Sequence, residues 1–108
     1  MAHYMVTGSY TSEAWAAQVK NPQNRLEGVR PLFEASGGKI ESAYYTFGEN
    51  DIILICEFPD NITAAAVSMI VASGGGVTNF NTTPLITMED GVEAMKKASD
   101  LTYAPPKS

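Results

Sequence analysis

Few residues of this chain have side chains suited to chemistry, and the acid Glu57 is the first among them. It lies near the end of the apolar run DIILICEF at residues 51–58. A carboxylate in a partly desolvated space is suited to proton transfer. The other interpretation is an acid at a strand end, paired with a lysine or with a partner chain. The sequence leaves both interpretations open.

His3 is the second candidate for catalysis, because it is the only histidine in the chain. Imidazole titrates near neutral pH, so His3 is suited to act as a base or as a single haem ligand. The alternative is a partly exposed strand residue. One histidine and the single cysteine, Cys56, lie far apart and cannot supply the three or four ligands of a zinc site. We therefore expect no metal and no cofactor, and we expect Cys56 to be a buried, unreactive thiol.

Four further residues are candidates for ligand binding: Tyr45, Asn79, Trp15 and Tyr10. Trp15 and Tyr10 could line a pocket for a planar ligand, or simply pack against the rest of the chain. Asn79 alternates with Phe80, which places the amide on the strand face opposite the aromatic ring. On a buried face, the amide would offer hydrogen bonds to a polar ligand group.

Tyr45 and its neighbour Tyr44 alternate along a strand, so only one of them can lie on a given face. A three-residue turn at residues 48–50 would pair Tyr45 with Ile53. A two-residue turn at residues 49–50 would instead bring Tyr44 onto the face of Ile55. We favour the first register, with Tyr45 on the face that carries Ile53.

Hydrophobic periodicity predicts the elements that position these residues. Strands are expected at residues 2–10, 39–47, 51–58 and 77–86, with the middle pair forming a hairpin. Helices are expected after Thr11, from about 22 to 36, from about 62 to 73, and after Thr87. Pro31 should kink or restart the second helix, and Pro84 restricts the last strand to a sheet edge or a strand end. We treat residues 1–108 as one domain, with a loosely ordered tail at about 103–108.

This order predicts an α+β fold, a ferredoxin-like βαββαβ sandwich with an extra C-terminal helix. Its four-stranded antiparallel sheet would carry helices on one face only. The strand at 51–58 is apolar on both faces, and Ile53 and Ile55 would lie on the uncovered face. Leaving an isoleucine pair in water forgoes a few kcal/mol, at about 25 cal/mol per Å². We therefore expect a homodimer that closes this face against a second copy, with Glu57 in or near the enclosed lumen.

Composition excludes two classes of partner. The net charge is −5, and the only adjacent basic pair is Lys96 and Lys97, so we expect neither nucleic-acid binding nor attraction to an anionic membrane. No targeting signal and no apolar run long enough to span a bilayer is visible. The sequence is therefore typical of a cytoplasmic protein.

The run YYTFGENDIILICEFPD, with GSYTSEAW before it and TTPLITMED after it, resembles the GYD-domain family of small bacterial proteins. The matching positions of the family pattern are Gly48, Asp51, Glu57, Pro59 and Asp60. Asn50 stands where the family usually has an aromatic residue. Asn tolerates turn conformations, so we expect the hairpin to be kept.

The resemblance implies a dimeric α+β barrel. Members of that superfamily include cofactor-independent monooxygenases, isomerases and haem-handling proteins. Two hypotheses follow: a homodimer that binds a small, partly aromatic ligand at the sheet, or a small enzyme that uses Glu57 and His3 as acid and base.

Overall fold

The computed structural model describes residues 1–107, in four strands and four helices. In chain order these are β1 (Ala2–Tyr10), α1 (Ser12–Lys20), α2 (Arg25–Ala35), β2 (Lys39–Tyr45), β3 (Ile52–Phe58), α3 (Asn61–Ser73), β4 (Val77–Leu85) and α4 (Met88–Ser99). The predicted order of elements is confirmed. Of the tail expected at 103–108, residues 103–107 contain no helix or strand, and Ser108 lies outside the described residues.

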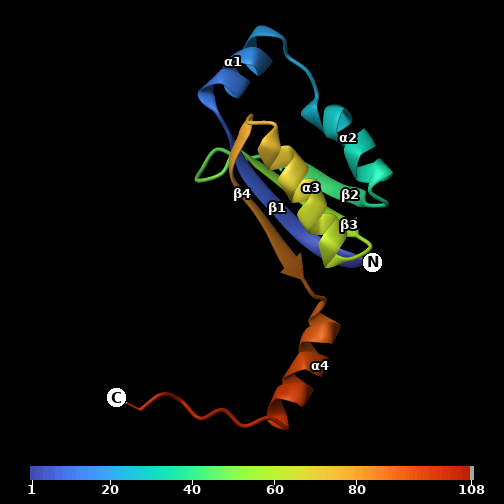
Figure 1. Ribbon diagram of the computed structural model, residues 1–108, viewed down its shortest axis with the longest axis vertical. Helices are drawn as coiled ribbons and strands as arrows, with labels where there is room; N and C mark the ends of the chain where they lie inside the picture. Colours follow the sequence, from blue (N-terminus) through green and yellow to red (C-terminus); the bar gives the residue numbers. More distant parts are fainter. Residues whose placement is uncertain (108) are drawn as a thin grey trace.

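The four strands form one antiparallel sheet in the order β2-β3-β1-β4 (Figure 1). This arrangement confirms the predicted ferredoxin-like α+β sandwich. β4 is an edge strand, and Pro84 lies next to its last residue. The missing amide of Pro84 is tolerated there, as expected from the sequence.

The hydrophobic core lies between one face of this sheet and the helices α2 and α3. It is formed by side chains from both layers: Tyr4, Val6, Phe33, Leu54, Cys56, Phe58, Ala64 and Val67. The rings of Phe33 on α2 and Phe58 on β3 are stacked with their centroids 5.3 Å apart. Ala64 and Val67 are one helical turn apart, and the short side chain of Ala64 lets α3 approach the sheet closely.

Each helix begins at a side-chain cap that the sequence supplies. The capping side chains accept a hydrogen bond from an amide two or three residues later: Thr11, Asn24, Asp60 and Thr87. At Asp60, the bond from the Thr63 amide lowers the pKa of the carboxyl group. Pro31 was expected to kink or restart α2; the chain continues through it as one helix, so there is no restart. The burial of Phe33 after the proline holds the second half of the helix on the sheet.

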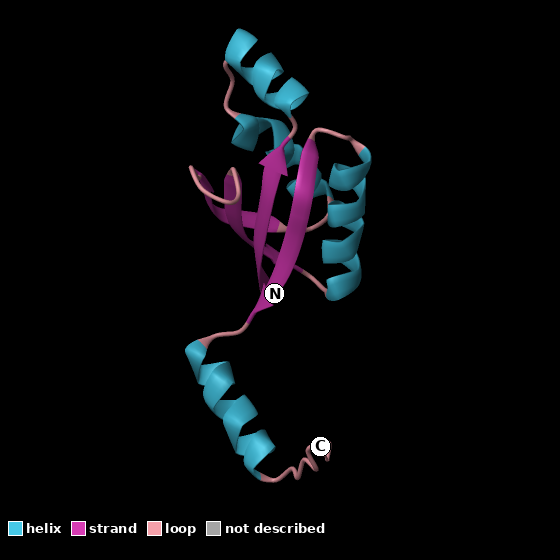
Figure 2. Cartoon of the chain, turned by 90° about the vertical axis from the view of Figure 1, so that its left-hand side faces the viewer, coloured by secondary structure: helices cyan, strands magenta, loops and turns pink. Residues whose placement is uncertain are grey.

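α4 projects away from the sandwich (Figures 1 and 2). Its apolar residues Met88, Val92 and Met95 are 88%, 49% and 71% exposed. The projecting helix and tail give a radius of gyration of 17.4 Å, against about 13 Å for a compact domain of this length. Among residues 1–107, no helix has both the length and the apolar character needed to cross a membrane.

The β2–β3 hairpin differs from both registers considered from the sequence. Tyr45 pairs with Ile52, and the Thr46 amide donates to the Asp51 carbonyl oxygen at 2.8 Å, so residues 47–50 form a four-residue loop. Tyr44 pairs with Ile53 and shares its face, whereas Tyr45 lies on the helix-covered face. The prediction that Tyr45 shares a face with Ile53 was therefore wrong. The loop has an even number of residues, so each β2 side chain lies on the sheet face opposite to the one that a three-residue turn would give it.

Candidate functional site

The sheet separates the candidate residues into two groups. Tyr10, Trp15 and Tyr45 lie on the helix side, around an apolar pocket. His3 and Glu57 lie on the opposite face, which no helix covers. The structure therefore does not bring the acid–base candidates together with the aromatic candidates.

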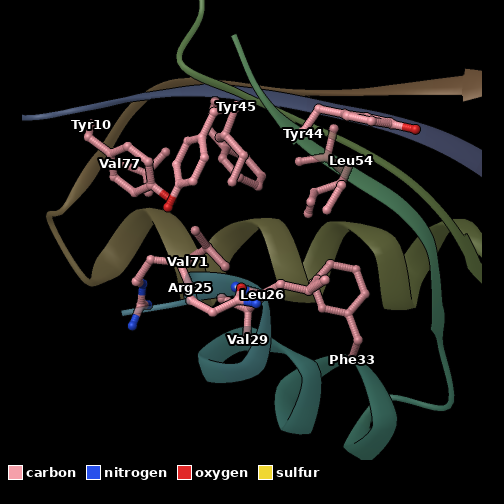
Figure 3. Close-up of a pocket in the computed structure, with 15 residues that line it drawn as sticks. Tyr10, Arg25, Leu26, Val29, Phe33, Tyr44, Tyr45, Leu54, Val71 and Val77 are labelled. Atoms are coloured by element: carbon pink, nitrogen blue, oxygen red, sulfur yellow. The ribbon is translucent and has the colours of Figure 1, made fainter. Parts of the chain in front are cut away.

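The apolar pocket lies between the sheet and the helices α2 and α3, and its cavity volume is about 220 Å³ (Figure 3). An apolar cavity of about 150 Å³ is large enough to hold benzene. The lining is dominated by aromatic and aliphatic side chains, among them Tyr10, Tyr45, Phe33, Phe80, Leu26, Val29, Val71 and Leu54. Such a surface fits a small ligand with at least one aromatic ring.

Three aromatic residues from separate elements meet at one end of this pocket. The Trp15 ring of α1 lies 5.1 Å from the Tyr10 ring and 5.9 Å from the Tyr45 ring, measured between centroids. The Tyr45 hydroxyl donates to Gln18 Oε1 at 3.3 Å. These contacts fix the orientation of Tyr45, whose ring lines the pocket.

Asp51 anchors this aromatic group to the sheet. Its Oδ2 atom accepts hydrogen bonds from the Tyr10 amide at 2.9 Å and from Trp15 Nε1 at 3.2 Å. The Asp51 amide donates to the Gly8 carbonyl oxygen at 2.9 Å. Asp51 therefore ties together β1, α1 and the start of β3, which is a positioning role for the pocket wall.

Arg25 is the only arginine or lysine on the pocket lining among the described residues. Arg25 is the first residue of α2, and Figure 3 shows its side chain at the same end of the pocket as Tyr10. Burial and the neighbouring Tyr45 raise the pKa of the Tyr10 phenol, while Arg25 acts in the opposite direction. The guanidinium therefore offers a positive charge beside an otherwise apolar cavity.

Leu26, Val29 and Phe33 are three or four residues apart in α2, and this spacing predicts a packing face but not a pocket wall. All three residues line the pocket. Helical spacing shows that the three residues share a face. The width of the space between that face and the sheet depends on the position and tilt of α2, which spacing does not give. No sequence signal marks Arg25, because a single arginine at a helix start is common.

Asn79 lies apart from the pocket lining. β1 and β4 lose their regular register between Thr7 and Ser9, and Asn79 adopts a positive φ of 49°. Its carbonyl oxygen accepts a bond from Asn81 Nδ2 at 3.1 Å. Phe80 packs against the core under the helices and lines the pocket. The bulge therefore gives Asn79 a backbone role in the sheet, away from Tyr45.

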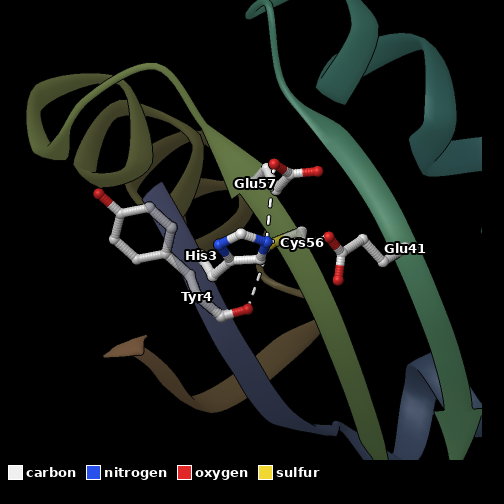
Figure 4. A network of polar contacts seen from close by, with 5 residues as sticks. All are labelled: His3, Tyr4, Glu41, Cys56 and Glu57. Atoms are coloured by element: carbon white, nitrogen blue, oxygen red, sulfur yellow. Dashed lines mark hydrogen bonds and ion pairs between the residues drawn. The ribbon is translucent and has the colours of Figure 1, made fainter. Parts of the chain in front are cut away.

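The uncovered face of the sheet carries a polar cluster of His3, Glu57 and Glu41, contributed by the adjacent strands β1, β3 and β2 (Figure 4). His3 pairs directly with Glu57 across the strands. His3 Nε2 lies 3.1 Å from Glu41 Oε1 and 3.6 Å from Glu57 Oε1. In the structure Lys39 is the β2 residue that pairs with Glu57.

Cys56 lies on the other face of β3 and is fully buried in the core. Burial, with a smaller contribution from Glu41, raises the pKa of its thiol from 9.0 to about 11. The thiol donates to the Tyr4 carbonyl oxygen. These observations agree with the prediction of an unreactive, structural cysteine.

Comparison with models of protein families gives a match. The model of a family described as GYD domain matches residues 4–95. No curated protein matches the chain. No solved structure matches it either. The match spans most of the chain, including every residue that lines the apolar pocket.

Proposed function

Since the chain belongs to the GYD domain family, we propose that it is a binding protein for a small, partly aromatic ligand. The observation that carries this proposal is the apolar cavity between the sheet and α2, lined by Tyr10, Tyr45, Phe33 and Phe80. We place the aromatic part of the ligand among these rings. A negatively charged group on the ligand would lie beside Arg25.

We also propose that the protein is a homodimer joined through the uncovered sheet face. Ile53 and Ile55 lie on that face, and neither is covered by a helix of its own chain. A second copy is the economical cover for such a surface, because two-fold dimers are the commonest oligomers. This arrangement would leave the apolar pocket accessible from the helix side.

The test is isothermal titration calorimetry of the protein with 2-naphthoate, an aromatic carboxylate of suitable size. We expect saturable binding, which is weakened at least about tenfold when Val29→Phe fills the cavity, a loss of about 1.4 kcal/mol. Val19→Phe is the matched control, because Val19 is 76% exposed on α1 and lies outside the pocket lining. Equal affinity in the two variants would refute the pocket as the site.

Arg25→Met tests the charged end of the site. It keeps the length and apolar character of the side chain but removes the cation. We expect this variant to bind 2-naphthoate more weakly while its affinity for the neutral 2-naphthamide is unchanged. An equal loss for both compounds would assign Arg25 a structural role instead.

A second candidate function, acid–base catalysis, is favoured by the placement of His3 between two carboxylates. This is the arrangement that a small enzyme of the monooxygenase or isomerase type would use, with Glu57 and His3 as acid and base. Under this alternative, any activity assigned to the protein should fall in both His3→Ala and Glu57→Gln. Binding of 2-naphthoate on the other side of the sheet should be unaffected.

A further inference from the structure

We propose that His3, Glu41 and Glu57 form a binding site for a divalent transition-metal ion on the uncovered sheet face. Each residue contributes one potential ligand atom, and the three atoms all lie within 4.8 Å of one another. The proposal is independent of the apolar pocket, because the sheet separates the two sites. It also differs from the sequence expectation, which counted only histidine and cysteine as ligands.

The distances between the ligand atoms suit a single ion. Metal–nitrogen and metal–oxygen bonds to Zn²⁺ are about 2.0–2.2 Å long. Two such ligands at a tetrahedral angle are therefore about 3.4 Å apart, and at a right angle about 3.0 Å apart. His3 Nε2 lies 3.1 Å from Glu41 Oε1 and 3.6 Å from Glu57 Oε1. The two carboxylate oxygens lie within 4.8 Å of each other, so binding of an ion would draw the Glu41 and Glu57 side chains together around it.

The sheet holds the three side chains in place. His3 and Glu57 are direct cross-strand partners on the two central strands β1 and β3. Glu41 comes from β2 at a bulge, where the register with β3 shifts between Ile40 and Ser42. Bulges re-aim side chains, and this one leaves Glu41 directed at the same imidazole. Three strands therefore supply ligands on a rigid support.

Charge gives a second reason for a cation at this position. Among residues 1–107, the ion pairs of Glu41 and Glu57 involve His3 alone, and no lysine or arginine forms an ion pair with either acid, although Lys39 lies opposite Glu57 in the strand register. A single Nε2–H group can donate one well-aligned hydrogen bond, so it serves only one of the two carboxylates. A divalent ion would neutralise both acids and would use the nitrogen as a ligand.

The ligand set indicates the class of ion. Imidazole favours zinc, iron and nickel, while carboxylates also accept manganese. Three protein ligands leave at least one coordination position for water or for a substrate, as in catalytic metal sites. In the single chain the side chains of His3, Glu41 and Glu57 are 39%, 34% and 17% exposed, so an ion can reach them before the proposed dimer covers this face. His3 lies just before the family match, so this site is inferred from the chain itself.

The test is a Zn²⁺ titration of the full chain without a histidine tag, followed by NMR and by calorimetry. His3 is the only histidine, so its ring ¹⁵N signals are assigned without ambiguity. We expect Zn²⁺ to shift the Nε2 signal and to bind with a stoichiometry of about one ion per chain. An unchanged Nε2 signal at saturating Zn²⁺ would overturn the proposal, whatever happens in the variants.

The variants Glu41→Gln and Glu57→Gln test the two carboxylates. Loss of an outer-shell partner typically weakens metal binding by 10–100-fold, so we expect removal of a ligand to cost at least about tenfold. Glu49→Gln is the matched control, because Glu49 is an exposed acid in the hairpin loop, at the other end of β2 and β3 from the cluster. Equal Zn²⁺ affinity in all three variants would also overturn the site. Circular dichroism of each apo variant checks that the fold is retained.

Discussion

At the scale of single residues, the role of a side chain in this protein is set by the face of the sheet on which it lies. Cys56 and Glu57 are neighbours in sequence, yet one is enclosed by the core and the other belongs to the polar cluster. Asp51 lies directly before β3, and its carboxylate holds Trp15 against the sheet. The type of each residue limits the chemistry that it can perform, and its position in the folded chain decides which role it has.

Burial of Cys56 predicts a loss of stability at alkaline pH. The folded thiol has a pKa of about 11 against an ordinary 9.0, so the folded state holds its proton more tightly. The stability that this tighter proton binding gives the folded state is fully present below pH 9. It is lost as the pH rises to about 11, and the loss lowers the free energy of unfolding by about 3 kcal/mol. Urea unfolding measured from pH 8 to 11 tests this.

Cys56→Ala is the control for that measurement. The Tyr10 phenol also has a raised pKa and acts in the same direction above pH 10. The variant keeps this contribution but loses that of Cys56, so its stability should decrease less steeply between pH 9 and 11. The same slope in both proteins would contradict the assignment to Cys56.

At the scale of elements, short connections determine how the helices sit on the sheet. The backbone from α2 to β2 makes a close approach to β3 at Gly38. A Cβ atom there would lie 2.8 Å from the Phe58 ring and 2.9 Å from the Glu57 carbonyl oxygen. Only glycine fits without moving β3, which carries both the core and the polar cluster.

We therefore expect Gly38→Ala to lower the free energy of unfolding by about 1–3 kcal/mol, the usual cost of overpacking. Gly48→Ala is the matched control, because nothing lies within 4 Å of a Cβ atom at Gly48, and its φ is not positive. Urea unfolding of the two variants measures the difference. A destabilisation of Gly48→Ala as large as that of Gly38→Ala would refute the steric explanation.

At the scale of the whole molecule, the isolated chain leaves two apolar surfaces uncovered. One is the sheet face with Ile53 and Ile55, and the other is the α4 stripe of Met88, Val92 and Met95. Helix and sheet faces of this kind normally pack against another layer. The elongated shape is thus consistent with the proposed dimer, in which a second copy supplies that layer.

Light scattering coupled to size exclusion tests the proposed dimer. We expect the native protein to show a mass of twice 11.6 kDa, and the double variant Ile53→Lys with Ile55→Lys to show a mass of 11.6 kDa. Burying four lysines at the two-fold interface would be unfavourable. The control places lysines at Ile62 and Ile70, which are 82% and 57% exposed on α3, and should remain dimeric. A monomeric native protein would contradict the proposal.

The sequence by itself determined the order of elements, the helix caps at Thr11 and Thr87, the antiparallel ferredoxin-like sandwich and the burial of Cys56. These depend on local periodicity and on side chains that bond to nearby amides, and both can be read along the chain. The family resemblance was also determined at this level and is confirmed by the match to residues 4–95.

Only the tertiary structure decided which side chains share a face of β2. The four-residue loop places Tyr45 under the helices. The bulge leaves Glu41 as an extra residue between the Ile40–Cys56 and Ser42–Ile55 pairs, which interrupts the regular alternation of faces. A shift of one residue exchanges the two faces of a strand, and sequence periodicity does not locate such a shift. The pocket around Tyr45 and the grouping of Glu41 with His3 and Glu57 both depend on it.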